Sequence, residues 1–310
     1  MDLTGVWRVA PVDEDLRRHH HDPDLDDASW PTLAVPGHWA DVNGLGDATS
    51  VAHRVRFDGP ADTDGTAGTD DGDPADGGRR RWWLRLDGIA TQGDVWLDGA
   101  YLGDTDGYFV PHVFEVTDLL AARRDHLLAV EVSCPEPGDA APRSVLTGAL
   151  QDPSLLGHRP RGVGGIWSGV RLVDTGPVAM RHVRVVCLEA DENRARLALR
   201  VVLDAPEATE LVLRTRIGGH EHERAQPAAR GETRVEWMVD VPRPDLWWPH
   251  NLGEPTLVDL EIAALVDGKV SDRRRRRTGL RSIRRRRGTL LVNGERLFVR
   301  GVGWVPTEVR

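Results

Sequence analysis

The stretch Asp94-Val95-Trp96-Leu97-Asp98-Gly99-Ala100-Tyr101-Leu102-Gly103 decides the class of fold. Apolar and polar residues alternate on both sides of Asp98-Gly99, and an Asp-Gly pair readily adopts the positive φ values that a two-residue hairpin turn requires. Asp267-Gly268 and Asn293-Gly294 repeat this signal further along the chain. Period-two alternation is typical of strands that bury one face, so the sequence predicts antiparallel β-structure.

The rest of the chain follows the same pattern, and long helical periodicity is missing. Further strand-length runs with alternating residues cover 3–9, 181–188, 195–203, 211–217, 233–241 and 257–266. One short helix is expected from Thr117 to Arg124, with Thr117 or Asp118 as its N-cap. Because 310 residues suit two domains of ordinary size, we predict an all-β chain of two consecutive sandwiches.

The composition narrows the function classes. With 49 acidic against 40 basic residues and a net charge of -9, the chain is a poor partner for nucleic acid. No run of 18 or more apolar residues occurs, and the amino terminus has no basic segment followed by an apolar one. We therefore expect a cytoplasmic protein without a membrane span.

Four segments have both a functional and a structural interpretation, and we favour the structural one for each. Residues 61–78 are predicted to be a disordered acidic loop, because their Asp-x-Asp-Gly fragments lack the twelve-residue frame of a calcium loop. His19 to His21 are predicted to lie in a surface loop, since three adjacent side chains cannot all reach one metal. The arginine runs 273–277 and 284–287 are predicted to be solvated strand ends. No metal or cofactor is expected.

An ordered series of motifs gives the chain a family resemblance. The motifs are Leu86–Ile89, Val95–Gly99, Leu102–Gly103, Gly107–Pro111, Phe114–Thr117, Gly164–Val170, Leu246–Pro249, Gly253–Pro255, Gly279–Arg281, Leu291–Glu295 and Val299–Val302. Together they resemble glycoside hydrolase family 2, which includes β-galactosidases, β-glucuronidases and β-mannosidases. The series covers nearly the whole chain.

The resemblance implies a domain order. Residues 1–177 would form a jelly-roll sandwich of the galactose-binding-like type, and residues 178–278 an immunoglobulin-like sandwich. Residues 279–310 would supply a hairpin and the first strand of the family's (β/α)₈ barrel. Such a barrel needs roughly 200 to 250 residues, so we expect the chain to end within that first strand.

The same resemblance limits the chemistry. Retaining glycosidases use two carboxyl groups about 5 to 5.5 Å apart, and the family carries both on the barrel, so no catalytic residue is expected here. The segment 301–308 is similar to the first barrel strand of β-mannosidases, which implies contact with sugar for Trp304 and Glu308 in an intact enzyme. Glu308 stands where the family pattern has aspartate, and residues 162–167 replace the tryptophan-rich motif of mannosidases.

Three hypotheses for function result. The first is the non-catalytic amino-terminal portion of a β-mannosidase-like exo-β-glycosidase, a hydrolase of O-glycosidic bonds once its barrel is present. The second is a stand-alone carbohydrate-binding module, suggested by the jelly roll and eleven tryptophans, although Trp96, Trp247 and Trp248 are expected to be structural. The third is a pair of structural domains for subunit contact. The expected partners are a β-glycoside carbohydrate and the barrel as domain or subunit, and an oligomer is left open.

Overall fold

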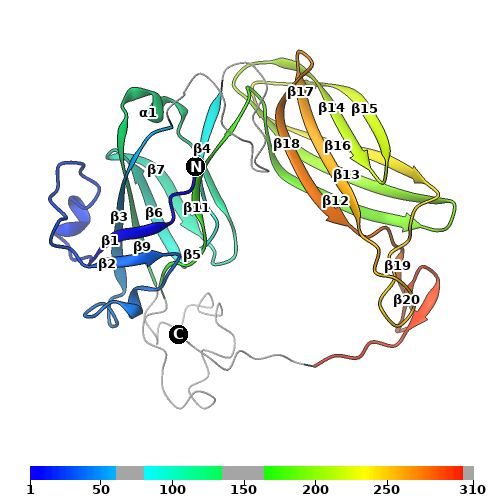
Figure 1. The fold of residues 1–310 in the computed structure, drawn as a ribbon, viewed down its shortest axis with the longest axis horizontal. Helices are drawn as coiled ribbons and strands as arrows, with labels where there is room; N and C mark the ends of the chain where they lie inside the picture. Colours follow the sequence, from blue (N-terminus) through cyan, green and yellow to red (C-terminus); the bar gives the residue numbers. More distant parts are fainter. Residues whose placement is uncertain (61–79, 135–163, 303–310) are drawn as a thin grey trace. The chain divides into compact units, whose positions relative to one another are not determined.

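The computed structural model describes residues 1–60, 80–134 and 164–302, and strands make up nearly all of their regular structure (Figure 1). These residues fall into two units. The first comprises residues 1–60, 82–134 and 164–173, and the second comprises residues 80–81 and 174–302. The acidic loop predicted at 61–78 lies outside the described residues.

The predicted two-residue turns are confirmed. Asp98 and Gly99 both have positive φ values, 53° and 80°, and they join β6 (Gln92–Leu97) to β7 (Ala100–Asp106). The other two turns are Asp267-Gly268 between β17 (Val258–Val266) and β18 (Lys269–Thr278), and Asn293-Gly294 between β20 (Thr289–Val292) and β21 (Glu295–Leu297). Paired positive φ values are those of a type I′ turn, whose twist matches that of the flanking strands.

The first unit is a sandwich of antiparallel strands. Its larger sheet has the order β2-β1-β3-β9-β6-β7, and its smaller sheets have the orders β11-β4-β8 and β10-β5. The bounds are β1 (Gly5–Pro11), β2 (Thr32–Val35), β3 (Ser50–Asp58), β4 (Arg81–Leu86), β5 (Ile89–Ala90), β8 (His112–Glu115), β9 (Asp125–Ser133), β10 (Gly165–Ile166) and β11 (Val170–Thr175). Trp7, Trp39 and Trp82 lie in its core, each no more than 2% exposed. Large buried rings of this kind supply much of the apolar area that stabilises a fold.

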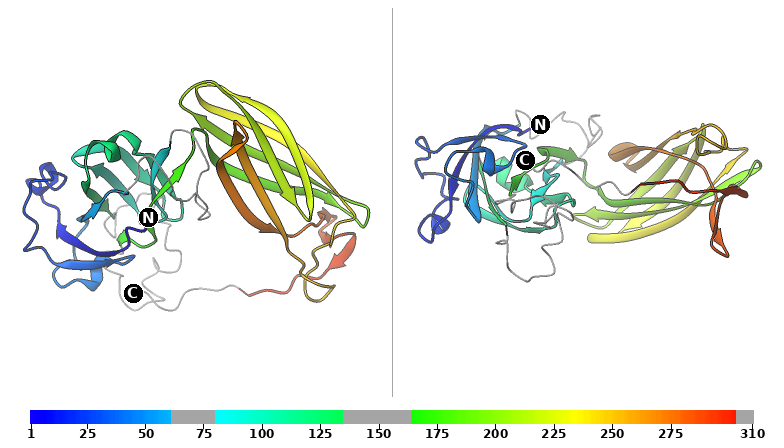
Figure 2. Two further views of the ribbon diagram at one scale, coloured as in Figure 1. Left: turned by 45° about the horizontal axis from the view of Figure 1, so that its top comes forward. Right: turned by 90° about the horizontal axis from the view of Figure 1, so that it is seen from below.

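The second unit is an immunoglobulin-like sandwich. A sheet of order β12-β13-β16 faces a sheet of order β15-β14-β17-β18, and a short ladder β19-β20-β21 follows. Its remaining bounds are β12 (Ala179–Ala190), β13 (Arg194–Ala205), β14 (Thr209–Ile217), β15 (His220–Ala228), β16 (Gly231–Pro242) and β19 (Ile283–Arg286). Along β13 every second residue from Ala195 to Leu203 is buried, as the alternation in the sequence predicted. Figure 2 shows these long strands from two further directions.

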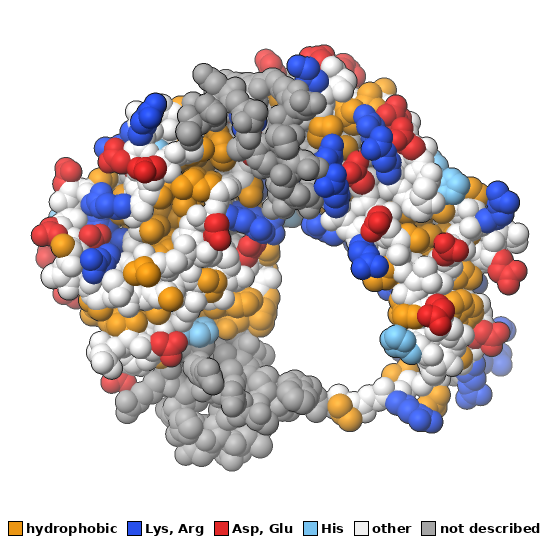
Figure 3. Space-filling view, viewed as in Figure 1, with side chains coloured by type: hydrophobic (Ala, Val, Ile, Leu, Met, Phe, Trp, Pro, Cys, Tyr) orange, Lys and Arg blue, Asp and Glu red, His pale blue; other side chains and the backbone are white. Residues whose placement is uncertain are grey.

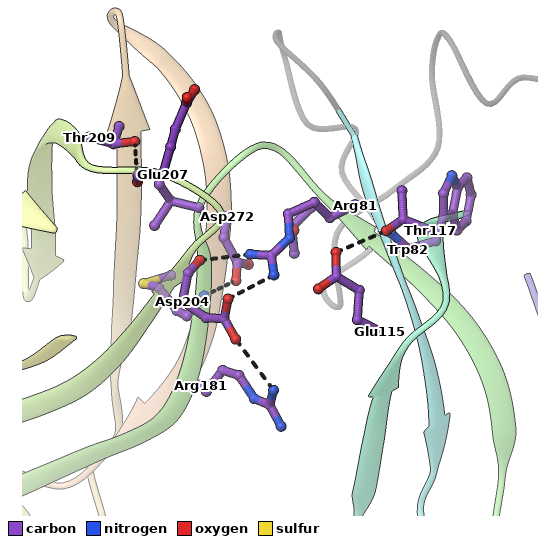
Figure 4. Close-up of polar contacts among 12 residues, drawn as sticks. Arg81, Trp82, Glu115, Thr117, Arg181, Asp204, Glu207, Thr209 and Asp272 are labelled. Atoms are coloured by element: carbon purple, nitrogen blue, oxygen red, sulfur yellow. Dashed lines mark hydrogen bonds and ion pairs between the residues drawn. The ribbon is translucent and has the colours of Figure 1, made fainter. Parts of the chain in front are cut away.

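The one α-helix differs from its prediction. Helix α1 spans Thr117–Ala122 and its N-cap is Val116, without a side-chain hydrogen bond. The hydroxyl of Thr117 is engaged elsewhere, since it accepts the backbone N–H of Trp82 at 2.9 Å and donates to Glu115 Oε1 at 3.1 Å (Figure 4). Thr117 therefore ties the helix to the neighbouring strand rather than capping it.

Several surface charges on β17 and β18 form ion pairs. In the sheet that contains β18, Arg275 and Arg273 lie 3.1 and 3.7 Å from Glu261 of β17. Figure 3 shows basic and acidic side chains interspersed over much of the face drawn there. Exposed pairs of this kind contribute little stability each. Within the described residues, no helix is long and apolar enough to cross a membrane.

Candidate functional site

The two residues that the resemblance placed against sugar, Trp304 and Glu308, belong to the segment 303–310. That segment lies outside the described residues, so their role stays a prediction. The structure instead brings together other parts of the motif series.

Three motifs meet in the first unit around Trp167. The indole stacks on the ring of Tyr108, with centroids 5.0 Å apart and planes inclined by 16°, and its Nε1 donates to the Tyr108 carbonyl at 3.0 Å. Gly88 leaves room for the indole, because a Cβ at this position would lie 2.5 Å from the ring. The backbone N–H of Trp167 donates to the Gly88 carbonyl at 3.2 Å. The motif series in the sequence could not show that these three segments form one cluster.

This cluster reaches the surface. Phe109 is 68% exposed and sets its ring edge-on against Trp167 with centroids 5.6 Å apart, and the neighbouring Val110 is 53% exposed. Burial raises the pKa of the Tyr108 hydroxyl. We call Tyr108, Phe109 and Trp167 the aromatic cluster. Exposed rings can stack against the apolar face of a sugar or pack against another protein surface.

Charged neighbours hold the chain beside the aromatic cluster. The Asp87 carboxylate lies 2.6 Å from Arg85 Nε through Oδ1 and 3.1 Å from Arg171 Nη2 through Oδ2. Its backbone N–H donates to the Gly169 carbonyl at 2.8 Å. Asp87 is therefore committed to two ion pairs that fix the segments on which Gly88 and Trp167 stand.

Trp247 of the second unit has a structural role. The guanidinium of Arg281 lies over the Trp247 ring, 4.8 Å from its centroid, and Asn293 Nδ2 donates to the Trp247 carbonyl at 2.9 Å. A Cβ on Gly279 would lie 2.6 Å from the Trp247 ring, which explains the glycine there. The motifs at 246–249, 279–281 and 291–295 thus pack on one another and position the ladder β19-β20-β21.

One buried carboxyl has the raised pKa that a catalytic acid needs. Burial raises the pKa of Asp174 to about 6, although the nearby Arg80 acts in the opposite direction. Arg80 Nη1 lies 3.3 Å from Asp174 Oδ2, and both side chains are at most 5% exposed. A general acid must reach its substrate, so this enclosed pair is better explained as a structural ion pair.

A second group of charges in the same unit is likewise structural (Figure 4). Arg81 donates to the Asp204 carbonyl at 2.8 Å and to Asp204 Oδ1 at 2.7 Å, and Arg181 lies 3.6 Å from Asp204 Oδ2. Asp272 accepts the backbone N–H of Met180 at 2.6 Å. These carboxylates are occupied by backbone and arginine donors. Among the residues that the structure describes, no three His, Cys, Asp or Glu side chains are arranged to hold a metal ion.

The prediction of a surface loop at His19 to His21 is wrong for His20. This imidazole is fully buried, and its Nε2 lies 3.1 Å from Glu131 Oε2 of β9. The same carboxylate accepts the Ser50 hydroxyl at 2.7 Å and Arg17 Nε at 3.0 Å. The loop between β1 and β2 is therefore pinned to the sheet by a carboxylate more than a hundred residues away, which no local pattern could reveal.

Two family models match the chain. One, described as the galactose-binding domain-like family of glycosyl hydrolase 2, matches residues 69–152, and the other, described as glycosyl hydrolases family 2, matches residues 178–281. The chain belongs to glycoside hydrolase family 2. The resemblance in the motif series and the predicted class of fold are thereby confirmed.

Curated relatives within family 2 include β-mannosidases. Beta-mannosidase B of Aspergillus terreus is 26% identical over 252 residues, which cover 73% of this chain and 30% of that protein. A mannosylglycoprotein endo-beta-mannosidase of Lilium longiflorum is 27% identical over 260 residues, 73% of this chain and 27% of that protein. The chain thus spans less than a third of the length of these relatives.

Solved structures of family 2 enzymes share the fold. The beta-D-mannosidase of Dictyoglomus thermophilum matches 99% of this chain and 40% of its own with a TM-score of 0.74 at 20% identity. Beta-glucuronidase 2 of Bacteroides uniformis matches 97% of this chain and 35% of its own with a TM-score of 0.75 at 19% identity. At such identities the likeness establishes the fold alone.

Proposed function

We propose that residues 1–310 form the non-catalytic amino-terminal part of a β-mannosidase-like exo-β-glycosidase of family 2. One observation carries the proposal: the two family models match in the family's order, and curated relatives at 24 to 27% identity are mannosidases. On this proposal the two sandwiches support a barrel that hydrolyses β-glycosidic bonds, and the barrel supplies both reacting carboxyl groups.

The contacts of three of the described carboxyls support the non-catalytic role. A retaining site needs a protonated acid and a free carboxylate about 5 to 5.5 Å apart and open to substrate. Asp174 is enclosed with Arg80, Glu131 is held by three donors, and Asp87 is committed to two arginines. Each of these groups is engaged in holding the fold.

A mechanism-based label tests this proposal. Retaining glycosidases form a covalent bond between their nucleophilic carboxylate and the sugar, and an aziridine of the cyclophellitol type traps that carboxylate. Incubation of the purified chain with the manno-configured aziridine should leave its intact mass unchanged. A stoichiometric adduct that peptide mapping places on an Asp or Glu of this chain would contradict the proposal.

A second candidate, a stand-alone carbohydrate-binding module, is favoured by the exposure of Phe109 in the aromatic cluster. Calorimetric titration of the chain with mannose, galactose and β-linked oligosaccharides tests it. Binding that Phe109→Ala abolishes would support this role, and the absence of any binding heat at millimolar sugar would count against it. A docking role for the same ring predicts instead that Phe109→Ala weakens self-association or capture of a barrel.

A further inference from the structure

A second aromatic surface lies in the first unit, on the outer face of the hairpin β6-β7. Trp96 and Tyr101 are directly opposite each other across the two strands, with ring centroids 5.3 Å apart. The alternate residues Val95 and Leu97 point into the core and are at most 1% exposed, so the two rings face away from it. Tyr101 is 55% exposed.

The loop between β1 and β2 adds a third ring. His21 stacks on the indole of Trp96, with centroids 5.3 Å apart and planes inclined by 13°. Burial, followed by the neighbouring His20, lowers the pKa of His21, so the ring is neutral near pH 7. A neutral imidazole offers a flat face and one hydrogen-bond donor.

This ring is held in place. The loop is anchored through His20 on Glu131, and through the fully buried Arg54, which lies 3.0 Å from Asp27 Oδ2 and donates to the Asp22 carbonyl at 2.8 Å. Rings that need no ordering on binding lose less conformational entropy when a ligand arrives.

Two carboxylates border the rings. Asp94 and Asp104 are direct cross-strand partners on the same hairpin, and Tyr101 Oη donates to Asp94 Oδ1 at 2.8 Å. This hydrogen bond is the largest of the effects that raise the pKa of Tyr101 to about 12. Like charges directly opposite each other destabilise a strand pair, so the hairpin keeps this pair at a cost. Hydrogen bonds donated by the hydroxyl groups of a ligand would reduce this repulsion, because each carboxylate oxygen accepts more than one hydrogen bond.

We propose that Trp96, Tyr101 and His21, with Asp94 and Asp104, form a binding surface for a neutral hexopyranose. The exposed ring of Tyr101 would stack on the apolar face of the sugar, while Trp96 and His21, which already stack on each other, would support that ring and border the site. The carboxylates would accept hydrogen bonds from the sugar's hydroxyl groups. A uronic acid is repelled, because its own carboxylate would approach Asp94 and Asp104. The surface is separate from the aromatic cluster of Tyr108, Phe109 and Trp167, and it does not depend on the proposed glycosidase role.

Titration of the whole chain tests the surface. Calorimetry and saturation-transfer NMR with methyl β-D-mannopyranoside and β-1,4-mannotriose should show millimolar binding, with sodium glucuronate bound about tenfold more weakly or not at all. Tyr101→Ala should weaken neutral-sugar binding about tenfold or more while leaving the unfolding midpoint in place, since the ring is exposed. Asp104→Asn should keep neutral-sugar binding and narrow the difference from glucuronate.

Phe298→Ala is the matched control, because it removes a ring of the second unit that is 75% exposed. It should leave the affinity for mannotriose unchanged. The proposal is overturned by any of three results: no binding of either neutral sugar at about 10 mM, binding of mannotriose that Tyr101→Ala leaves unchanged, or glucuronate bound as tightly as mannoside.

Discussion

At the scale of single residues, the buried carboxylate of Glu131 holds three side chains of the first unit together. Burial acts to raise its pKa, but hydrogen bonds from His20, Ser50 and Arg17 outweigh this and lower the pKa from 4.5 to about 2. A carboxyl with a depressed folded-state pKa stabilises the fold above its ordinary pKa, and this contribution is lost as pH falls from about 4.5 through about 2.

Glu131→Gln should therefore lower the free energy of unfolding of the first unit at pH 7, by about 1 to 3 kcal/mol, because three donors lose a charged acceptor. The difference from the parent chain should shrink as pH falls from 5 towards 2. Denaturant titrations at several pH values measure both effects. Glu14→Gln, a change at an exposed loop position, should produce neither; a constant difference at every pH would contradict the explanation.

Asp174 should contribute to stability with the opposite pH dependence. Its folded-state pKa is raised from 3.8 to about 6 by burial, so the folded chain binds this proton more tightly, and stability from it is lost as pH rises through that window. Asp174→Asn should remove this dependence. Calorimetric unfolding temperatures at pH 4 and pH 7 should show the variant gaining relative to the parent chain as pH rises. A relative loss at pH 7 would show that the ion pair with Arg80 outweighs burial.

Residue roles were the hardest part to predict from sequence. The burial of His20 depends on Glu131, which is brought near it by the pairing of β1 with β3 and of β3 with β9. The cluster around Trp167 likewise depends on the pairing of β10 with β5. Contacts between residues far apart in the sequence are set by strand register. The pattern of a sequence shows which face of the sheet a residue occupies but not which residue it contacts.

At the scale of elements, local turn chemistry was sufficient to predict the hairpins, because Asp-Gly and Asn-Gly pairs adopt paired positive φ values with little strain. Strand β15 follows a turn of the same kind at Gly218-Gly219, but its own sequence has little apolar alternation. Its sequence from His220 to Ala228 is mostly polar and contains Pro227, and the structure places it at the edge of its sheet. An edge strand tolerates proline and needs few large apolar residues, so alternation is weak there.

The fit between Gly88 and Trp167 gives a test at this scale. Gly88→Ala would put a Cβ 2.5 Å from the indole, so the ring must move and the contact between the two motifs must open. We expect a loss of about 1 to 3 kcal/mol in the first unit and a red shift in tryptophan emission. Gly46→Ala is the matched control, because nothing lies within 4 Å of its added Cβ. Equal stability of the two variants would contradict the packing described here.

At the scale of the whole molecule, the residues of the family 2 motifs in the two sandwiches pack against one another. The tryptophans at 167 and 247 hold segments together, and the charged residues beside them are paired. On the proposed function, such units would support a catalytic domain, and bond cleavage would take place in another part of the enzyme.

Turnover by the purified 310 residues tests this account most directly. With the chain present, aryl β-mannoside, β-galactoside and β-glucuronide should each release aryl alcohol no faster than they do in buffer alone. Release that follows the chain through purification and disappears when Asp174, Glu131 or another of its carboxylates is replaced would contradict it.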